Sequence, residues 1–290
     1  MAAHLRWKLS VPDALEERFG DWLSENGASA FYREADPPHA FFAYFPPGQA
    51  APDASGLAAF PGVELITAEG FEDEDWLAKS REGFGRIEVG AKFLIVPLWD
   101  TDPVPGDRTP VVVNPGLAFG TGGHETTRLC MELLEGLAAR GELKGPGLDI
   151  GAGTGILALA AFHLGARKLV AFDLDPDCGP AMEELITMNA AALKGATPFT
   201  SFVGLLEDAR AAGPWNLMLA NILLETIQDL LPAMVERLAA GGRLIASGIL
   251  AEREDEAFLS LAAEGLRLLE VRREGAWIAI LAEKPGSEKP

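Results

Sequence analysis

The chain has 290 residues, of which 48% are hydrophobic, and its 24 basic and 43 acidic side chains give a formal net charge of −19. This length allows a sizeable core and two domains, and no apolar run approaches the ~20 residues that cross a bilayer. A strongly acidic surface repels phosphate backbones and attracts cationic partners, although plain solubility explains the charge equally well. We therefore expect a protein without direct nucleic-acid binding and without a membrane segment.

The cysteine and histidine residues indicate the cellular compartment and whether a metal site is expected. Cys130 and Cys178 both fall in helical contexts, and the four histidines show no ligand spacing with each other or with cysteine. Two packed thiols fit a reducing environment better than a disulfide does. The N-terminus also lacks the long apolar core of a signal peptide. We expect a cytoplasmic protein without a structural zinc or any other metal site.

The first stretch predicts a small α+β domain. Residues 5–11 alternate between apolar and polar side chains, which indicates a half-buried strand, and apolar residues at helical spacing follow from Asp13 until Asn26-Gly27. Short strands at 30–33 and 41–45, a short helix and a strand over 63–71 come next. The order βαββαβ predicts a ferredoxin-like domain over residues 1–71, whose aromatic residues we interpret as core and sheet surface.

A connector over residues 72–100 joins this domain to a larger one over residues 101–290. The connector begins with an acidic run and contains a short helix with Trp76 and the strand KFLIVPLW, and three prolines mark the entry to the second domain. The second domain is predicted to alternate as follows: helix 125–140, strand 148–150, a helix, strand 168–172, helix 177–193, strands 199–203 and 215–220, helix 223–239, strand 243–248 and helix 251–264. Two strands joined by a tight Glu-Gly turn close the chain, so one strand runs antiparallel to its neighbour. This ending is typical of S-adenosylmethionine (AdoMet)-dependent methyltransferases and rare in dehydrogenases.

The stretch LDIGAGTGI holds a glycine turn between strand and helix, and Asp173 ends the next strand 20 residues after Gly153. This βαβ unit serves several nucleotides. The dinucleotide pattern is G-x-G-x-x-G, whereas here the third glycine is Gly155, which gives G-x-G-x-G. AdoMet has no phosphate, but it needs the side-chain-free backbone of Gly151 and Gly153, and the two oxygens of Asp173 are suited to two ribose hydroxyls. These features favour AdoMet over NAD. The alternative that this is a tight turn without any ligand stays open.

Two further motifs point to one family. NPGLAFGTGGHETT (Asn114–Thr127) and ANILLETIQDLLPAMVERLAAGGRLIASGIL (Ala220–Leu250), together with the glycine turn, resemble the PrmA family, the methyltransferases of the large-subunit ribosomal protein L-eleven. The similarity runs from about Trp76 to the C-terminus. It implies a ferredoxin-like substrate-recognition domain, a connecting helix and a seven-stranded, Rossmann-like AdoMet domain. It also implies an AdoMet-dependent protein-lysine N-methyltransferase that modifies lysine and N-terminal amines of this basic ribosomal protein.

The resemblance also implies roles for single residues. Thr127, Gly151, Asp173 and Asn221 match AdoMet contacts of the family, and Phe119 matches a residue that covers the cofactor or the entering amine. Ala152, Gly123 and Glu125 depart from frequent family residues without removing a matched contact. We expect Asn221 to accept N–H bonds from the amine and to aim its lone pair at the methyl group.

Plainer interpretations of these residues stay open. Thr126 and Thr127 can also cap the following helix, His124 is a loop hydrogen-bonder rather than a base, and Asn221 can be a turn residue.

Other functions also fit parts of the sequence. An amino-methyltransferase of nucleic acids would follow Asn221 with Pro-Pro-aromatic, to stack a flipped base, but Ile222-Leu223-Leu224 follow here. A methyltransferase of another protein or of a small molecule would have the same cofactor half. A non-catalytic AdoMet-binding module is the third alternative.

Overall fold

The computed structural model describes residues 4–12, 15–28, 30–33, 40–46, 54–71, 85–115 and 122–286. The chain divides into two compact units, Met1–Gly83 and Phe84–Pro290. The predicted helix around Trp76 lies outside the described residues, and residues 85–100 belong to the second unit. In the described ranges, no helix has the length and hydropathy needed to cross a membrane.

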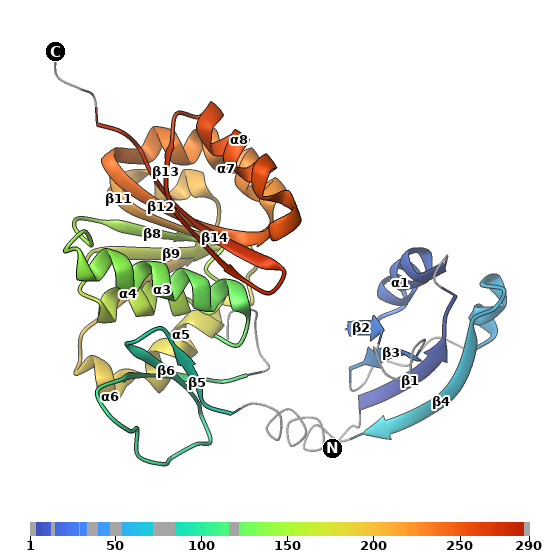
Figure 1. Ribbon diagram of the computed structural model, residues 1–290. Helices are drawn as coiled ribbons and strands as arrows, with labels where there is room; N and C mark the ends of the chain where they lie inside the picture. Colours follow the sequence, from blue (N-terminus) through green and yellow to red (C-terminus); the bar gives the residue numbers. More distant parts are fainter. Residues whose placement is uncertain are drawn as a thin grey trace. The chain divides into compact units, whose positions relative to one another are not determined.

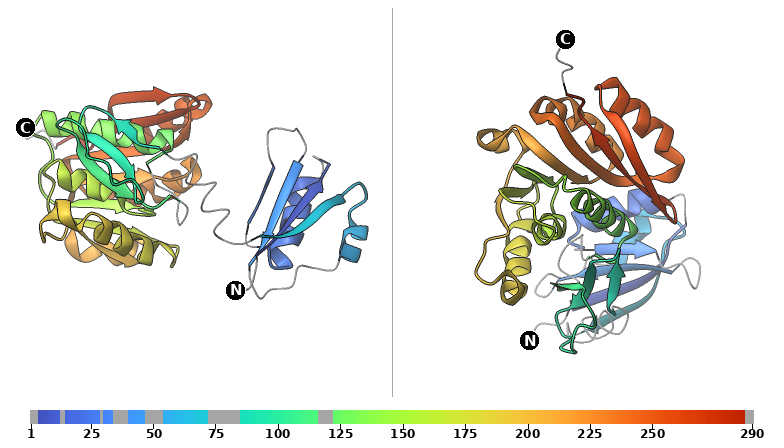
Figure 2. Two further views of the ribbon diagram at one scale, coloured as in Figure 1. Left: turned by 90° about the horizontal axis from the view of Figure 1, so that it is seen from below. Right: turned by 60° about the vertical axis from the view of Figure 1, so that its left-hand side comes forward.

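The first unit is a four-stranded antiparallel sheet in the order β2-β3-β1-β4, with α1 (Glu16–Glu25) on one face (Figure 2). Its strands are β1 (His4–Ser10), β2 (Ala30–Arg33), β3 (Ala40–Phe45) and β4 (Glu64–Phe71). This order confirms the ferredoxin-like prediction. The second crossover is a 3₁₀ segment, η2 (Ala54–Ala59), in which Gly56 lies so close to the ring of Trp22 that a Cβ atom would be 2.8 Å from it.

The second unit contains a seven-stranded sheet in the order β10-β9-β8-β11-β12-β14-β13 (Figure 1). The strands are β8 (Gly147–Ile150), β9 (Leu169–Asp173), β10 (Phe199–Val203), β11 (Trp215–Asn221), β12 (Leu238–Leu250), β13 (Arg267–Glu274) and β14 (Trp277–Glu283). Neighbours from β10 to β12 are parallel, and β14 is antiparallel to both β12 and β13. The predicted C-terminal hairpin is therefore confirmed, as is the methyltransferase fold.

Helices cover both faces of this sheet (Figure 1). The first core lies under α3 (Glu125–Ala139), α4 (Ile156–His163) and α5 (Cys178–Met188), and the second under α7 (Leu224–Arg237) and α8 (Glu254–Ala263). Short 3₁₀ segments are η3 (Leu206–Ala212) and η4 (Ala251–Arg253). The predicted helix 177–193 is interrupted at Asn189, where α6 (Ala190–Leu193) begins.

A three-stranded sheet, β5 (Ile87–Val89), β6 (Phe93–Pro97) and β7 (Thr109–Val113), packs beside α3 and α5. Of these three strands the sequence predicted only β6. Pro110 was interpreted as part of the entry to the second domain rather than as a residue of a strand. Proline is tolerated in an edge strand when its missing N–H points outward. The side chain of Asn189 bonds this outer edge, since it accepts from the Val112 N–H at 2.9 Å and donates to the Val112 carbonyl at 2.8 Å. The side chain of Asn189, where the predicted long helix is interrupted, therefore pairs with the outer edge of β7.

Candidate functional site

A cavity of about 1030 Å³ lies at the carboxyl ends of β8, β9, β10 and β11. The residues that end or follow these strands line it, among them Ile150, Asp173, Gly204 and Asn221. The neighbours β8 and β11 are followed by helices on opposite faces of the sheet, α4 and α7. The cavity therefore occupies the topological switch point, where open α/β sheets hold ligands.

The glycine turn forms the base of the cavity. Gly151, Gly153 and Gly155 have φ angles of +63°, +55° and +81°, values that L side chains rarely adopt. A Cβ atom on Gly151 would lie 2.4 Å from Cγ2 of Ile222. Gly151 and Gly153 both line the cavity, and the space beside Gly151 is filled by the Ile222 side chain.

Asp149 lies directly below this turn and is buried. The N–H of Ala158, in α4, donates to its Oδ2 at 2.9 Å and links strand to helix. Burial raises the pKa of the Asp149 carboxyl to about 8, and the nearby charge of Asp173 contributes in the same direction. Asp149 is therefore protonated at neutral pH, which the sequence did not predict.

Asp173 ends β9 and lines the cavity. Its Oδ2 accepts from the N–H of Gly153 at 2.8 Å, and its Oδ1 accepts from the N–H of Asp175 at 3.0 Å. Each carboxylate oxygen has a second lone pair, so the two backbone bonds orient the group and leave acceptor capacity.

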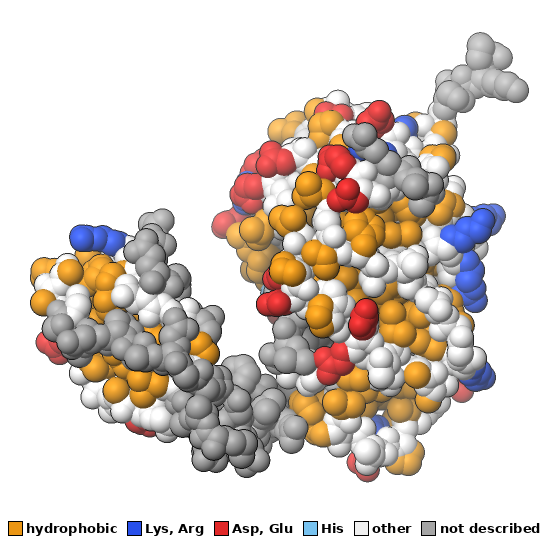
Figure 3. Space-filling model, turned by 180° about the vertical axis from the view of Figure 1, so that it is seen from behind, with side chains coloured by type: hydrophobic (Ala, Val, Ile, Leu, Met, Phe, Trp, Pro, Cys, Tyr) orange, Lys and Arg blue, Asp and Glu red, His pale blue; other side chains and the backbone are white. Residues whose placement is uncertain are grey.

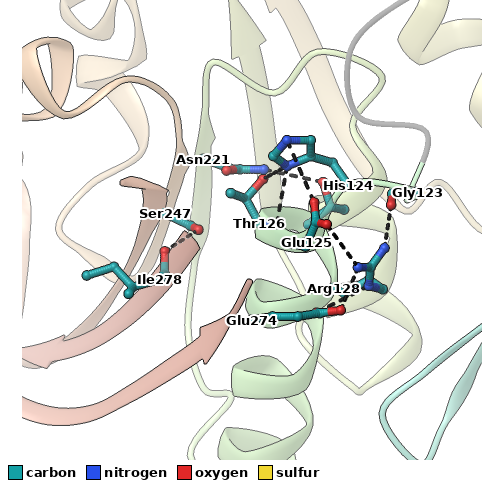
Figure 4. A network of polar contacts seen from close by, with 10 residues as sticks. Gly123, His124, Glu125, Thr126, Arg128, Asn221, Ser247, Glu274 and Ile278 are labelled. Carbon is teal, nitrogen blue, oxygen red and sulfur yellow. Dashed lines mark hydrogen bonds and ion pairs between the residues drawn. The ribbon is translucent and has the colours of Figure 1, made fainter. Parts of the chain in front are cut away.

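Asn221 ends β11, and its side chain points toward the first turn of α3 (Figure 4). Its Nδ2 donates to Oγ1 of Thr127 at 3.3 Å, and Thr127 is buried. The buried Oδ1 atom of Asn221 has no hydrogen-bond partner within the described part of the chain. A buried acceptor without a partner costs roughly 1–3 kcal/mol, which a hydrogen-bond donor at this position would offset.

The residue that caps α3 is His124, rather than either threonine. Its Nδ1 accepts from the N–H of Thr126 at 3.3 Å and lies 2.8 Å from Oγ1 of Thr126. Arg128 anchors the same turn by donating to the Gly123 carbonyl and to Glu274 of the C-terminal hairpin (Figure 4). The Glu274 carboxylate raises the pKa of the Arg128 guanidinium.

The structure brings Gly151, Gly153, Asp173 and Asn221 together in one cavity and holds Thr127 against Asn221. Phe119 lies outside the described residues. The lining residues that the sequence did not predict include Trp277, the apolar residues Ile222 and Leu223, and Gly248. A Cβ atom on Gly248 would lie 2.2 Å from the Ile222 carbonyl oxygen. The available signal was this glycine at the end of the predicted strand 243–248.

Comparisons with known proteins agree with this geometry. The sequence profile of one protein family, ribosomal protein L11 methyltransferase (PrmA), matches residues 50–285. The chain belongs to the ribosomal protein L11 methyltransferase family. Curated members from Pelobacter propionicus and Geobacter metallireducens are 40% and 38% identical to it, over 72% and 77% of this chain and 67% and 70% of theirs. The crystal structure of ribosomal protein L11 methylase from Lactobacillus delbrueckii subsp. bulgaricus has 32% identity and a TM-score of 0.61, and it covers 70% of this chain and all of that one.

Proposed function

We propose that the protein is a cytoplasmic, AdoMet-dependent N-methyltransferase that modifies lysine side-chain amines and the N-terminal amine of ribosomal protein L11. The names of its relatives support this substrate. The observation that carries the proposal is the unpartnered Oδ1 of Asn221, a residue that lines the same cavity as the glycine turn. An acceptor there matches an incoming amine, which is a hydrogen-bond donor.

The residues present fit AdoMet. Gly151 and Gly153 line the cavity without side chains, and the remaining lone pairs of Asp173 suit ribose hydroxyls. A carboxylate-lined cavity also suits a cationic cofactor better than the pyrophosphate of NAD. When bound, AdoMet supplies a methyl group on a positively charged sulfonium.

The chain's own residues meet the other needs of the transfer. A lysine amine has a reference pKa of ~10.4, and a nearby positive charge and partial desolvation both favour its neutral form. Asn221 Oδ1 accepts an N–H of that amine and directs its lone pair. The amide is neutral, so it adds no charge that would hold the proton on the amine. Ile222, Leu223 and Trp277 line the cavity and give it an apolar wall beside the groups to be aligned.

The test is incubation of the purified protein with labelled AdoMet and unmethylated ribosomal protein L11, followed by mass spectrometry of the product. We expect label on lysine side chains and on the N-terminal amine of L11. Label on a small molecule or on another protein, with none on L11, would overturn the substrate. AdoMet binding without transfer to any acceptor would instead indicate a non-catalytic module.

A further inference from the structure

We propose that the part of the cavity next to α7 binds the substrate chain beside the target amine, and that Glu207 and Asp229 select a cationic segment there. This inference rests on the proposed function, because it assumes that an amine-bearing protein enters the cavity. Glu207 and Asp229 are then specificity-determining residues of that reaction.

The cavity extends well beyond the glycine turn because the connection from β10 to β11 is short. The 3₁₀ segment η3 stands there in place of a long helix, and α7 packs against β11 and β12. Ile150 and Phe172, on the second core face, therefore also line the cavity. A volume of about 1030 Å³ matches the upper end of the ~300–1,000 Å³ typical of pockets for single small ligands. It leaves room for a substrate segment next to a cofactor.

The wall on the α7 side has an apolar, one-sided pattern. Leu223, Thr226 and Leu230 line the cavity, and their spacing of three and four residues places them on one helix face. Leu223 is 66% exposed, which is unusual for a leucine that lines a cavity. Such a face accommodates the methylene stems of lysine side chains, whose charged ends remain free.

Charge on the cavity wall has one sign. Five lining residues are acidic (Asp173, Asp175, Asp177, Glu207 and Asp229), and no described lining residue is Lys or Arg. Asp173 and Asp175 accept backbone N–H bonds. Glu207 and Asp229 have neither a hydrogen bond nor an ion pair with any side chain that the structure describes. Figure 3 shows a face of the molecule on which acidic side chains lie among exposed apolar ones.

Position along α7 separates Asp229 from the transfer step. Asp229 lies five residues after Leu224, the first residue of α7, which is about 7.5 Å along the helix axis. A carboxylate directly beside the amine would keep it protonated. The amine itself faces the neutral, unpartnered Asn221 Oδ1, which is an independent sign of a donor ligand in this cavity. Basic residues that flank the amine in the substrate reach Glu207 and Asp229.

The test compares the double variant Glu207→Gln/Asp229→Asn with Glu236→Gln, which removes an exposed charge from the same α7 helix outside the cavity. Two synthetic peptides serve as probes beside ribosomal protein L11: one has a lysine flanked by Lys and Arg, the other a lysine flanked by Ser and Ala. Methylation kinetics are measured at low and high salt, and AdoMet affinity is measured by calorimetry.

We expect the double variant to raise KM for the basic peptide about tenfold and to weaken its salt dependence, with kcat and AdoMet affinity changed less than about twofold. The neutral peptide and the Glu236→Gln control should show no such change. An unchanged KM ratio between the two peptides, or the same loss in Glu236→Gln, would overturn the proposal. Failure of the unaltered protein to methylate L11 would overturn the proposed function instead.

Discussion

The side-chain amide of Asn221 donates to the hydroxyl of Thr127, which precedes it by 94 residues, at an Nδ2–Oγ1 distance of 3.3 Å. This bond joins the end of β11 to the first turn of α3. Because the bond uses the NH₂ end of the amide, the carbonyl end is the one left without a partner. Thr127 therefore positions Asn221 as an acceptor.

Thr127→Val removes that positioning bond and keeps the side-chain shape. We expect methylation to slow by up to about tenfold, because one hydrogen bond of ~0.5–1.5 kcal/mol holds the amide in place. Thr127→Ser keeps the hydroxyl and should retain most of the rate. Equal kcat/KM values for the valine and serine variants would show that the bond has no positioning role.

Asn221→Ala should lower kcat by about tenfold or more, since ~1.4 kcal/mol of barrier is a factor of ten. Asn221→Asp is the sharper change, because a carboxylate stabilises the ammonium form of the amine. Its pH–rate profile should shift to higher pH, and turnover should change more than AdoMet affinity. Near-normal rates and profiles for both variants would make Asn221 a turn residue.

Asp173→Ala should weaken AdoMet binding by about 1.5–3 kcal/mol, the range for hydrogen bonds to a charged group. The loss has two sources, since Asp173 also orients the glycine turn through the Gly153 N–H. Asp173→Asn keeps an acceptor and should lose less. Calorimetric titration with AdoMet and with NAD checks both points, and tight NAD binding without AdoMet binding would contradict the cofactor assignment.

Asp149 should make stability fall as pH rises. The folded protein keeps this proton up to about pH 8, whereas the ordinary value for an aspartate is 3.8. The native state therefore binds more protons between these values, and its stability decreases by up to about 1.4 kcal/mol per pH unit there. Asp149→Asn should remove this slope and keep an acceptor for the Ala158 N–H. The urea-unfolding midpoints of the unaltered protein and of Asp149→Asn are compared between pH 5 and 8. If the two midpoints change with pH in the same way, Asp149 is ionised in the folded protein.

The first unit should serve substrate recognition. A chain that begins at Phe84 keeps every lining residue that the structure describes, because these lie between His124 and Trp277. We expect it to bind AdoMet with unchanged affinity and to lose methylation of ribosomal protein L11. AdoMet binding also verifies that the shortened chain is folded. Unchanged kcat/KM for L11 would assign recognition to the second unit alone.

Much of the fold followed from local patterns in the sequence. The glycine turn, the acid at the end of β9 and the C-terminal hairpin all depend on residues close in sequence, and each is where the pattern indicated. What depends on distant partners was not predictable. Pro110 is compatible with β7 only because its side of the strand faces outward, and the helix break at Asn189 is explained only by its bonds to Val112.

Some features of the candidate site were likewise predictable from local motifs, and others depend on distant partners. Motif positions predicted Gly151, Asp173 and Asn221, but no pattern indicated that His124 rather than a threonine would cap α3. The ring of His124 lies edge-on against Trp277, the first residue of β14 in the C-terminal hairpin, with centroids 5.0 Å apart. Likewise, the raised pKa of Asp149 depends on burial in the assembled core.

The pairing of Asn189 with Val112 has a consequence for the behaviour of the protein in a crowded cell. The outer edge of β7 presents an N–H and a carbonyl that a strand from another copy would otherwise join. One amide side chain satisfies both groups, in the way a neighbouring strand would. The small sheet thus ends at Asn189, which occupies the two groups that edge-to-edge pairing between copies would need at this point.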